Sequence, residues 1–178
     1  MLTYILIGLL ALIVLFLVVV SSRPADFRVT RSASIAAPPS VVFEYVNDLH
    51  KWNEWSPWAK MDPNAKHTYE GPPAGPGASF AWDSAKVGAG RMTITETQPV
   101  DRILEKLEFS KPFVATNVVE FTFQPDGDRT AVTWSMSGKN GFMAKAFGLF
   151  FNCDKMCGDQ FEQGFANLKS IVESPVGV

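Results

Sequence analysis

Two acidic residues in the middle of the chain have the type and spacing for acid–base chemistry. Glu96 and Glu105 flank Val100-Asp101, a short break between two segments that alternate apolar and polar residues. If Val100-Asp101 forms a two-residue turn, the two carboxyl groups face each other on the apolar side of the hairpin. Repulsion between facing carboxylates raises the pKa of one of them, as a general acid requires. The alternative is that both are solvated near the hairpin end, and a shift of one residue in the turn abolishes the pairing.

Three further polar side chains are candidates for the rim of a binding site. Arg31 shares one side of an alternating segment with apolar residues, so it could hold an anionic ligand, pair with a glutamate or extend its charge to the surface. His67 and Tyr69 are the other titratable candidates, and the sequence indicates no partner for either. These residues are compatible with ligand binding but define no reaction.

The cysteines and histidines do not form a metal-binding pattern. Cys153 and Cys157 are four residues apart in a segment of helical periodicity, whereas His50 and His67 are distant in the sequence. Consecutive helical turns also disfavour a disulfide between the two cysteines. We therefore expect no metal and no other cofactor, and we interpret both cysteines as small apolar core residues.

The first 20 residues carry no charge and are mostly aliphatic. A helix of this length spans roughly 30 Å, the thickness of the bilayer hydrocarbon, so we predict a transmembrane helix at 1–20 and a linker at 21–26. The alternative, a cleavable signal peptide, normally has basic residues before an apolar run of about 7–15 residues. Arg23, Arg28 and Arg31 follow the run and no Lys or Arg precedes it. The positive-inside rule therefore predicts a single-pass protein of the cell (inner) membrane with its domain in the cytoplasm.

The remaining chain has the size of one soluble domain, at 27–174, with a tail at 175–178. The whole chain has a net charge of −2 and a pI of about 5.7, which offers no basic surface for nucleic acid. The expected partners are therefore the membrane and a small molecule, not nucleic acid, and the sequence does not indicate an oligomeric state.

Alternating segments punctuated by Gly and Pro predict an antiparallel sheet, with strands near 26–36, 66–71, 78–84, 88–98, 102–111, 115–125 and 129–137. Asp126-Gly127 is expected to close a hairpin in which Phe123 faces Thr130. Pro38-Pro39 begins a short helix, and a second short turn leads to three tryptophans, Trp52, Trp55 and Trp58. From about 140 to 173 the periodicity is helical, so one long C-terminal helix is expected to cover the apolar side of the sheet.

Several stretches carry a resemblance to a known family: Ser34–Phe43, Val46–Trp58, Gly90–Glu96, Thr133–Met136 and Asp154–Lys169. With the order strand, two short helices, six strands and long helix, they resemble the START-like, or SRPBCC, superfamily over residues 28–173. The closest resemblance is to its polyketide cyclase/dehydrase and lipid-transport branch. It implies an α+β helix-grip fold, in which a curved antiparallel sheet wraps around the C-terminal helix.

In that superfamily the space between sheet and helix is a cavity. The resemblance implies that strand residues line it, namely Phe80, Trp82, Met92, Ile94, Leu107, Phe109, Phe121, Phe123, Trp134 and Met136, together with Phe147, Phe151, Phe161 and Phe165 from the helix. The Pro/Gly-rich loop 71–77 and the three tryptophans are candidates for its entrance. The same side chains also suit a filled core, and the sequence leaves both possibilities open.

The sequence best fits membrane-tethered binding of a hydrophobic small molecule or lipid in an internal cavity. One alternative is a cyclase or hydrolase for a hydrophobic substrate that uses Glu96 and Glu105. Another is a non-catalytic module that binds a protein partner, as the chaperone-activating relatives do. The sequence contains no nucleophile elbow, phosphate-binding loop or metal triad, so we expect binding rather than catalysis.

Overall fold

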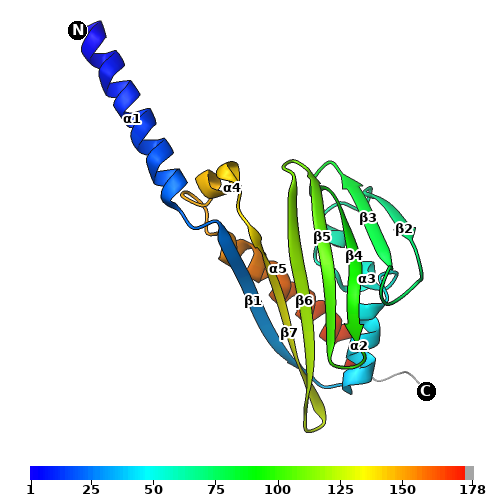
Figure 1. Cartoon of the computed structure of the whole chain (residues 1–178). Coiled ribbons are helices and arrows are strands. Elements are labelled where there is room, and N and C mark those ends of the chain that lie inside the picture. Colours follow the sequence, from blue (N-terminus) through cyan, green and yellow to red (C-terminus); the bar gives the residue numbers. More distant parts are fainter. Residues whose placement is uncertain (175–178) are drawn as a thin grey trace.

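The computed structural model describes residues 1–174, and within them seven antiparallel strands form one curved sheet (Figure 1). The strands are β1 (Asp26–Ile35), β2 (Lys66–Glu70), β3 (Ser79–Ser84), β4 (Gly88–Gln98), β5 (Arg102–Lys111), β6 (Ala115–Asp126) and β7 (Arg129–Lys139). Their spatial order is β1-β7-β6-β5-β4-β3-β2. The predicted strands are thus confirmed to within a few residues at their ends. The expected tail at 175–178 lies outside the described residues.

The helices follow the predicted order. They are α1 (Leu2–Ser22), α2 (Pro39–Asn47), α3 (Trp52–Trp55), the 3-10 turn η1 (Trp58–Lys60), α4 (Phe142–Phe147) and α5 (Cys153–Val172). Pro39 starts α2, at a position where a missing N–H breaks no helical hydrogen bond. Helix α5 lies across one face of the sheet, which is the predicted helix-grip architecture (Figure 1).

The prediction of one continuous helix over residues 140–173 is wrong. Helix α4 ends at Phe147, and the chain makes no regular helix again until Cys153. The side chain of Asn152 accepts a hydrogen bond from the backbone N–H of Lys155 at 2.9 Å, so Asn152 caps a new helix instead of continuing the old one. Residues 148–152 therefore separate a short helix from the long one.

The β6–β7 hairpin confirms the faces that alternation predicts but not the exact register. Asp126 pairs with Arg129, so the loop is Gly127-Asp128 and Phe123 faces Val132 instead of Thr130. Gly127 has φ 63°, a left-handed conformation that glycine adopts without strain. The predicted register differs by two residues on β7, and because side chains alternate with a period of two, every residue stays on its predicted face.

Helix α1 projects from the domain and is the one helix in the described residues that is long and apolar enough to span a membrane, with a mean hydropathy of 3.1 (Figure 1). It ends at Ser22, two residues beyond the predicted boundary. A signal sequence near an N-terminus can meet the same criteria of length and apolar composition. Helix α1 contacts α4, and the side chain of Val20, in the last turn of α1, is fully buried. The end of α1 is therefore in contact with the domain.

Candidate functional site: a cavity between the sheet and helix α5

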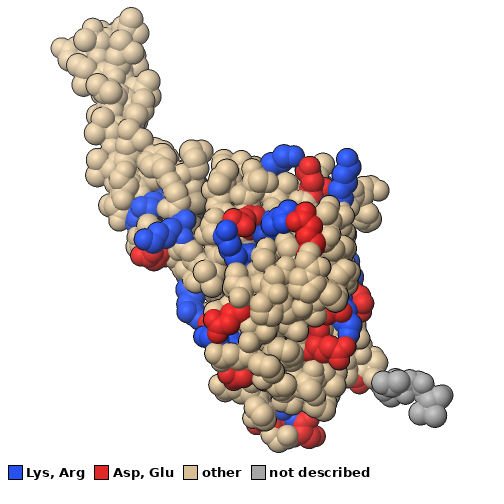
Figure 2. Space-filling view, turned by 45° about the vertical axis from the view of Figure 1, so that its right-hand side comes forward, with Lys and Arg blue, Asp and Glu red and all other residues tan. Residues whose placement is uncertain are grey.

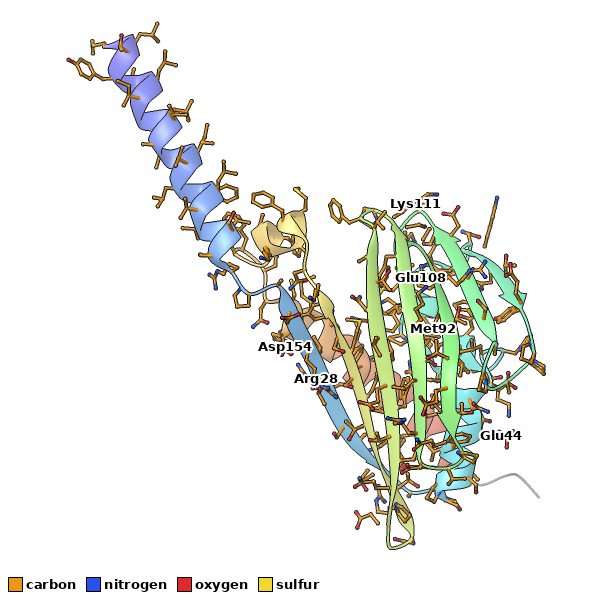
Figure 3. The ribbon with its side chains drawn as sticks, viewed as in Figure 1. Arg28, Glu44, Met92, Glu108, Lys111 and Asp154 are labelled. Atoms are coloured by element: carbon orange, nitrogen blue, oxygen red, sulfur yellow. The ribbon has the colours of Figure 1, made fainter. Side chains whose placement is uncertain are left out.

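A cavity of about 200 Å³ lies between the concave face of the sheet, the α3–η1 segment and α5. Its wall is predominantly apolar and consists of Trp52, Asn53, Ser56, Trp58, Ala59, Ala65, His67, Phe80, Trp82, Val87, Met92, Leu107, Phe109, Val119, Trp134, Met136, Cys157 and Phe161. Alternation places side chains from β2 to β7 on this one face, and Met92 lies midway along β4 (Figure 3). Ligand pockets typically measure about 300–1,000 Å³, so the cavity as it stands suits a small or slender apolar molecule.

The structure places eight of the fourteen predicted lining residues in the cavity wall: Phe80, Trp82, Met92, Leu107, Phe109, Trp134, Met136 and Phe161. Ile94, Phe121, Phe123 and Phe165 also point inward, but they are buried in the packed part of the interior. Phe123, for example, packs edge-on against Phe43 of α2 at 5.4 Å between ring centroids. The interior is therefore solid beside α2 and hollow beside the first half of α5.

The expectation that Phe147 and Phe151 line the cavity is wrong. Both side chains are exposed and stack on each other, with ring centroids 4.2 Å apart. Phe147 ends α4 and Phe151 precedes α5, so the break at 148–152 carries both away from the concave face. Helical periodicity alone does not reveal this break.

Trp134 of β7 forms the centre of the cavity wall. Its indole stacks on the ring of Phe161 from α5, with centroids 4.1 Å apart and planes 8° from parallel. Trp52 and Trp58 meet Trp134 edge-on at 5.7 and 6.0 Å. A Cβ on Gly164 would lie 2.9 Å from this indole, so the glycine allows α5 to approach the sheet closely. Three elements thus converge on one aromatic surface.

A small polar group interrupts the apolar wall. The Asn53 side-chain amide donates to the Tyr69 hydroxyl at 2.9 Å and lies 3.2 Å from Nδ1 of His67. Asn53 and His67 line the cavity, whereas Tyr69 lies behind them and stacks on His50 at 4.4 Å. The hydroxyl of Ser56, also in the wall, is buried and has no hydrogen-bond partner among residues 1–174. These groups offer a guest molecule a few hydrogen bonds along the α3–η1 segment.

The loop 71–77 and the three tryptophans were the candidates for the entrance, and only two of the tryptophans lie at the cavity. Trp52 and Trp58 line it, but Trp55 is fully buried and donates its indole N–H to the Tyr45 carbonyl at 3.3 Å. None of the residues 71–77 is in the wall. That loop instead makes a tight turn in which Gly71, with φ +80°, lies against the Gly77 carbonyl.

Arg31, expected at the rim, does not line the cavity and instead joins β1 to α5. Its guanidinium forms ion pairs with Asp154 and Glu162 at 3.1 Å each. Asp154, at the start of α5, lies beside β1 (Figure 3). A Cβ on Gly158 would collide with this guanidinium, so the glycine makes room for it on the helix. The sequence left three roles open for Arg31: holding an anionic ligand, pairing with a glutamate, or extending to the surface. In the structure Arg31 pairs with a glutamate, Glu162, and with Asp154.

The predicted pairing of Glu96 with Glu105 is wrong. Glu105 lies opposite Ile94, and Glu96 lies opposite Leu104, because a bulge at Thr95 adds one residue to β4. The bulge turns Glu96 to the outer face, where it binds Arg102 at 2.6 Å. The two carboxyl groups therefore do not form an acid–base pair.

Glu105 itself is buried in the interior. It is 1% exposed, and neither carboxyl oxygen has a hydrogen-bond partner among the described residues. Burial raises its pKa to about 8, so the group is mostly uncharged at neutral pH. It lies opposite Val119, a wall residue, and two residues from Leu107 on the same face. Glu105 is thus a neutral acid next to the cavity.

The interpretation of both cysteines as core residues holds only in part. Cys157 is half-buried in the cavity wall, where burial raises the pKa of its thiol, whereas Cys153 is exposed at the start of α5. Sequence reasoning missed the wall residues Asn53, Ser56, Ala59, Ala65, Val87 and Val119. Val119 shares its strand face with Phe121 and could have been found by alternation. The others lie in short turns that have no periodicity.

Solved structures share this architecture. A protein from Chromobacterium violaceum superposes with a TM-score of 0.62 at 17% identity, over 86% of this chain and 100% of that one. The Aha1 dimer from Colwellia psychrerythraea gives 0.61 at 13% identity, over 85% and 99% of the two chains. A protein from Mesorhizobium loti gives 0.61 at 19% identity, over 83% and 97%. At these identities the similarity establishes the fold alone.

Among curated proteins, none is significantly similar to this chain in sequence. The family model for polyketide cyclase / dehydrase and lipid transport, in contrast, matches residues 26–173, from the start of β1 to the end of α5. The match covers every strand of the sheet and the whole cavity wall. The chain therefore belongs to the polyketide cyclase / dehydrase and lipid transport family.

Proposed function

We propose that the protein is a membrane-tethered receptor for a hydrophobic small molecule or lipid, which it holds in the cavity between sheet and α5. The observation that carries this proposal is the hollow itself: aromatic side chains, Met92 and Met136 surround about 200 Å³ of space in an otherwise packed interior. Methionines change rotamer at low cost, so the cavity can adapt to a larger guest. Ser56 and the Asn53–His67 pair would hydrogen-bond to a polar group on that guest.

The position of the cavity supports a tether through α1. Cys157 and Phe161 lie in the first half of α5, which is the half nearer α1 and α4 (Figure 1). Val87, in the β3–β4 turn, is also part of the wall. A molecule that partitions into the bilayer would therefore be concentrated near the end of the domain where the cavity lies. The arginine bias after α1 favours the cytoplasmic side.

Native mass spectrometry of the full chain released from mild detergent tests the binding proposal. We expect a co-purifying small molecule on the wild type and on Val118→Trp, whose new ring lies on the exposed outer face of β6. We expect it to be lost from Leu107→Trp, because the larger ring fills the cavity. Equal retention by both variants, or no bound molecule on the wild type, would contradict the proposal.

The tether has a separate test. The intact mass of the purified protein shows whether residues 1–22 are retained or cleaved as a signal sequence. A retained helix that stays in the membrane pellet at alkaline pH supports the tether. Cleavage, or release of the chain by alkali, contradicts it and leaves the binding proposal intact.

A further inference from the structure

A second hollow lies where α1 meets the domain. It is an open groove of about 470 Å³ between residues 23–24 and the segment 140–153. Its wall includes two cations, Arg23 and Lys145, and the large apolar side chains of Leu149, Phe150 and Phe151. Neither cation forms an ion pair with a carboxylate of residues 1–174. Positive charge and exposed aromatic rings thus share one groove.

The groove is held at the end of α1 by direct contacts. Only residues 23–25 separate α1 from β1, and the Asn140 N–H donates to the Ala25 carbonyl at 2.7 Å. Helix α4 contacts α1, and the buried side chain of Val20 fixes the last helical turn. If α1 crosses a bilayer, the groove lies at the level where the hydrocarbon ends and the lipid headgroups begin.

Apolar side chains gather at this same end of the domain. Phe142, Met143, Phe147, Phe150 and Phe151 are all exposed, and Phe150 is 74% exposed. Phe113 and Val114, in the β5–β6 turn, are exposed too, and that turn lies at the same end of the sheet as α4 (Figure 1). Contiguous exposed apolar patches mark contact surfaces, and aromatic residues favour the membrane interface.

The charge distribution agrees with a lipid surface as the partner. Figure 2 shows Lys and Arg side chains at the base of α1, where the uncharged surface of that helix ends. Cations at this depth attract anionic headgroups, while aromatic rings beside them insert among the acyl chains. A protein partner is a weaker fit, because α1 places the groove against the bilayer before any other molecule can reach it.

We propose that this groove binds the headgroup of an anionic phospholipid, with Arg23 and Lys145 at its phosphate and Phe150 and Phe151 beside its acyl chains. This inference rests on the tether through α1 proposed above. It gives the domain a second contact with the membrane, independent of the cavity.

Photo-crosslinking of the full chain in liposomes tests the inference. Two preparations contain diazirine-bearing phosphatidylglycerol or diazirine-bearing phosphatidylcholine, and mass spectrometry locates the adducts. We expect both lipids to label α1, and phosphatidylglycerol to label residues 140–153 at least fivefold more than phosphatidylcholine at low salt. Arg23→Gln with Lys145→Gln should remove that preference. Lys60→Gln with Lys66→Gln, a control with the same net charge at exposed positions, should not.

The possible results separate this inference from the tether. Labelling of α1 without labelling of 140–153 would contradict lipid binding in the groove and would leave the proposed tether intact. Equal labelling by the two lipids, unchanged in the Arg23/Lys145 variant, would also contradict the groove proposal. Loss of labelling at 140–153 in millimolar inorganic phosphate would show that the groove binds free phosphate instead. If neither α1 nor residues 140–153 are labelled, the tether proposal is contradicted. The groove proposal, which depends on it, is then contradicted too.

Discussion

The indole of Trp134 lies parallel to the ring of Phe161, with centroids 4.1 Å apart, and this stack joins β7 to α5 beside the cavity. Both rings are nearly fully buried. The contact therefore supports the fold and shapes the cavity at the same time. A change at Phe161 must alter stability and cavity size together.

Phe161→Ala should lower the free energy of unfolding by about 3–5 kcal/mol, because it removes a buried ring and leaves a void that the surroundings fill only partly. The larger cavity should accept a bulkier guest. Urea denaturation measures the first effect and native mass spectrometry the second. Phe151→Ala is the matched control, since its ring is exposed, and it should change neither. Equal losses in the two variants would contradict the structure.

Gly90→Ala should destabilise the domain by about 1–3 kcal/mol and move Trp82. A Cβ at this position would lie 2.4 Å from the Glu108 carbonyl oxygen, which the sheet holds in place, and 2.7 Å from the Trp82 ring. Denaturation and tryptophan fluorescence measure the two effects. Gly148→Ala, where the new Cβ makes only ordinary contacts from 3.4 Å, should be close to neutral. A neutral Gly90→Ala would show that Trp82 does not cover this strand.

Glu105 should make the domain less stable as pH rises. Its pKa is about 8 in the folded chain and 4.5 ordinarily, so between these values the unfolded chain gives up a proton that the folded chain keeps. At about 1.4 kcal/mol per pH unit, stability falls by about 5 kcal/mol from pH 4.5 to 8 and then levels off. Glu105→Gln should abolish this slope in urea titrations.

Glu96→Gln is the control for that experiment, because Glu96 is on the outer face with Arg102. It should leave the slope between pH 4.5 and 8 unchanged. If Glu105→Gln also keeps the slope, the carboxyl of Glu105 is not buried as described.

Arg31→Met should lower the melting temperature, and the loss should shrink in 1 M salt. The guanidinium bridges Asp154 and Glu162, and salt screens ion pairs between partly exposed groups. Arg28→Met removes a single, more exposed pair with Glu120 and should have a smaller effect. A loss independent of salt would indicate that Arg31 acts through its packing alone.

The two cysteines should differ in reactivity towards a maleimide. Cys153 is exposed, whereas Cys157 is half-buried in the cavity wall with its thiol pKa raised by burial. We expect fast labelling of Cys153 and slow labelling of Cys157. A guest in the cavity should slow Cys157 further and leave Cys153 unchanged, which makes Cys153 an internal control. Protection of both or neither would argue against binding at this wall.

Alternation predicted the strands and their inner faces, since Phe121, Trp134 and Met92 all lie on the face where the sequence places them. It failed at Glu96 because one extra residue, Thr95, reverses the faces beyond it. A bulge of this kind leaves no signature in hydrophobic periodicity.

The cavity wall was harder to predict than the sheet. Whether inward-facing aromatic residues fill the space between the sheet and α5 depends on the distance between these two layers. That distance cannot be predicted from the sequence pattern. Phe147 and Phe151 illustrate the limit. They fit a helical pattern, but the capping side chain of Asn152 ends that pattern locally and sends both rings outward. Short-range hydrogen bonds of this kind override periodicity.

Only residues 23–25 separate α1 from β1, and the side chain of Val20, in the last turn of α1, is fully buried. If α1 is the membrane anchor proposed above, a tilt of α1 is passed on to the domain, and the protein reaches only the patch of membrane beside it. A membrane-tethered receptor of the kind proposed above would not ferry cargo across the cell. It would pass its guest to, or receive it from, whatever comes to the same surface.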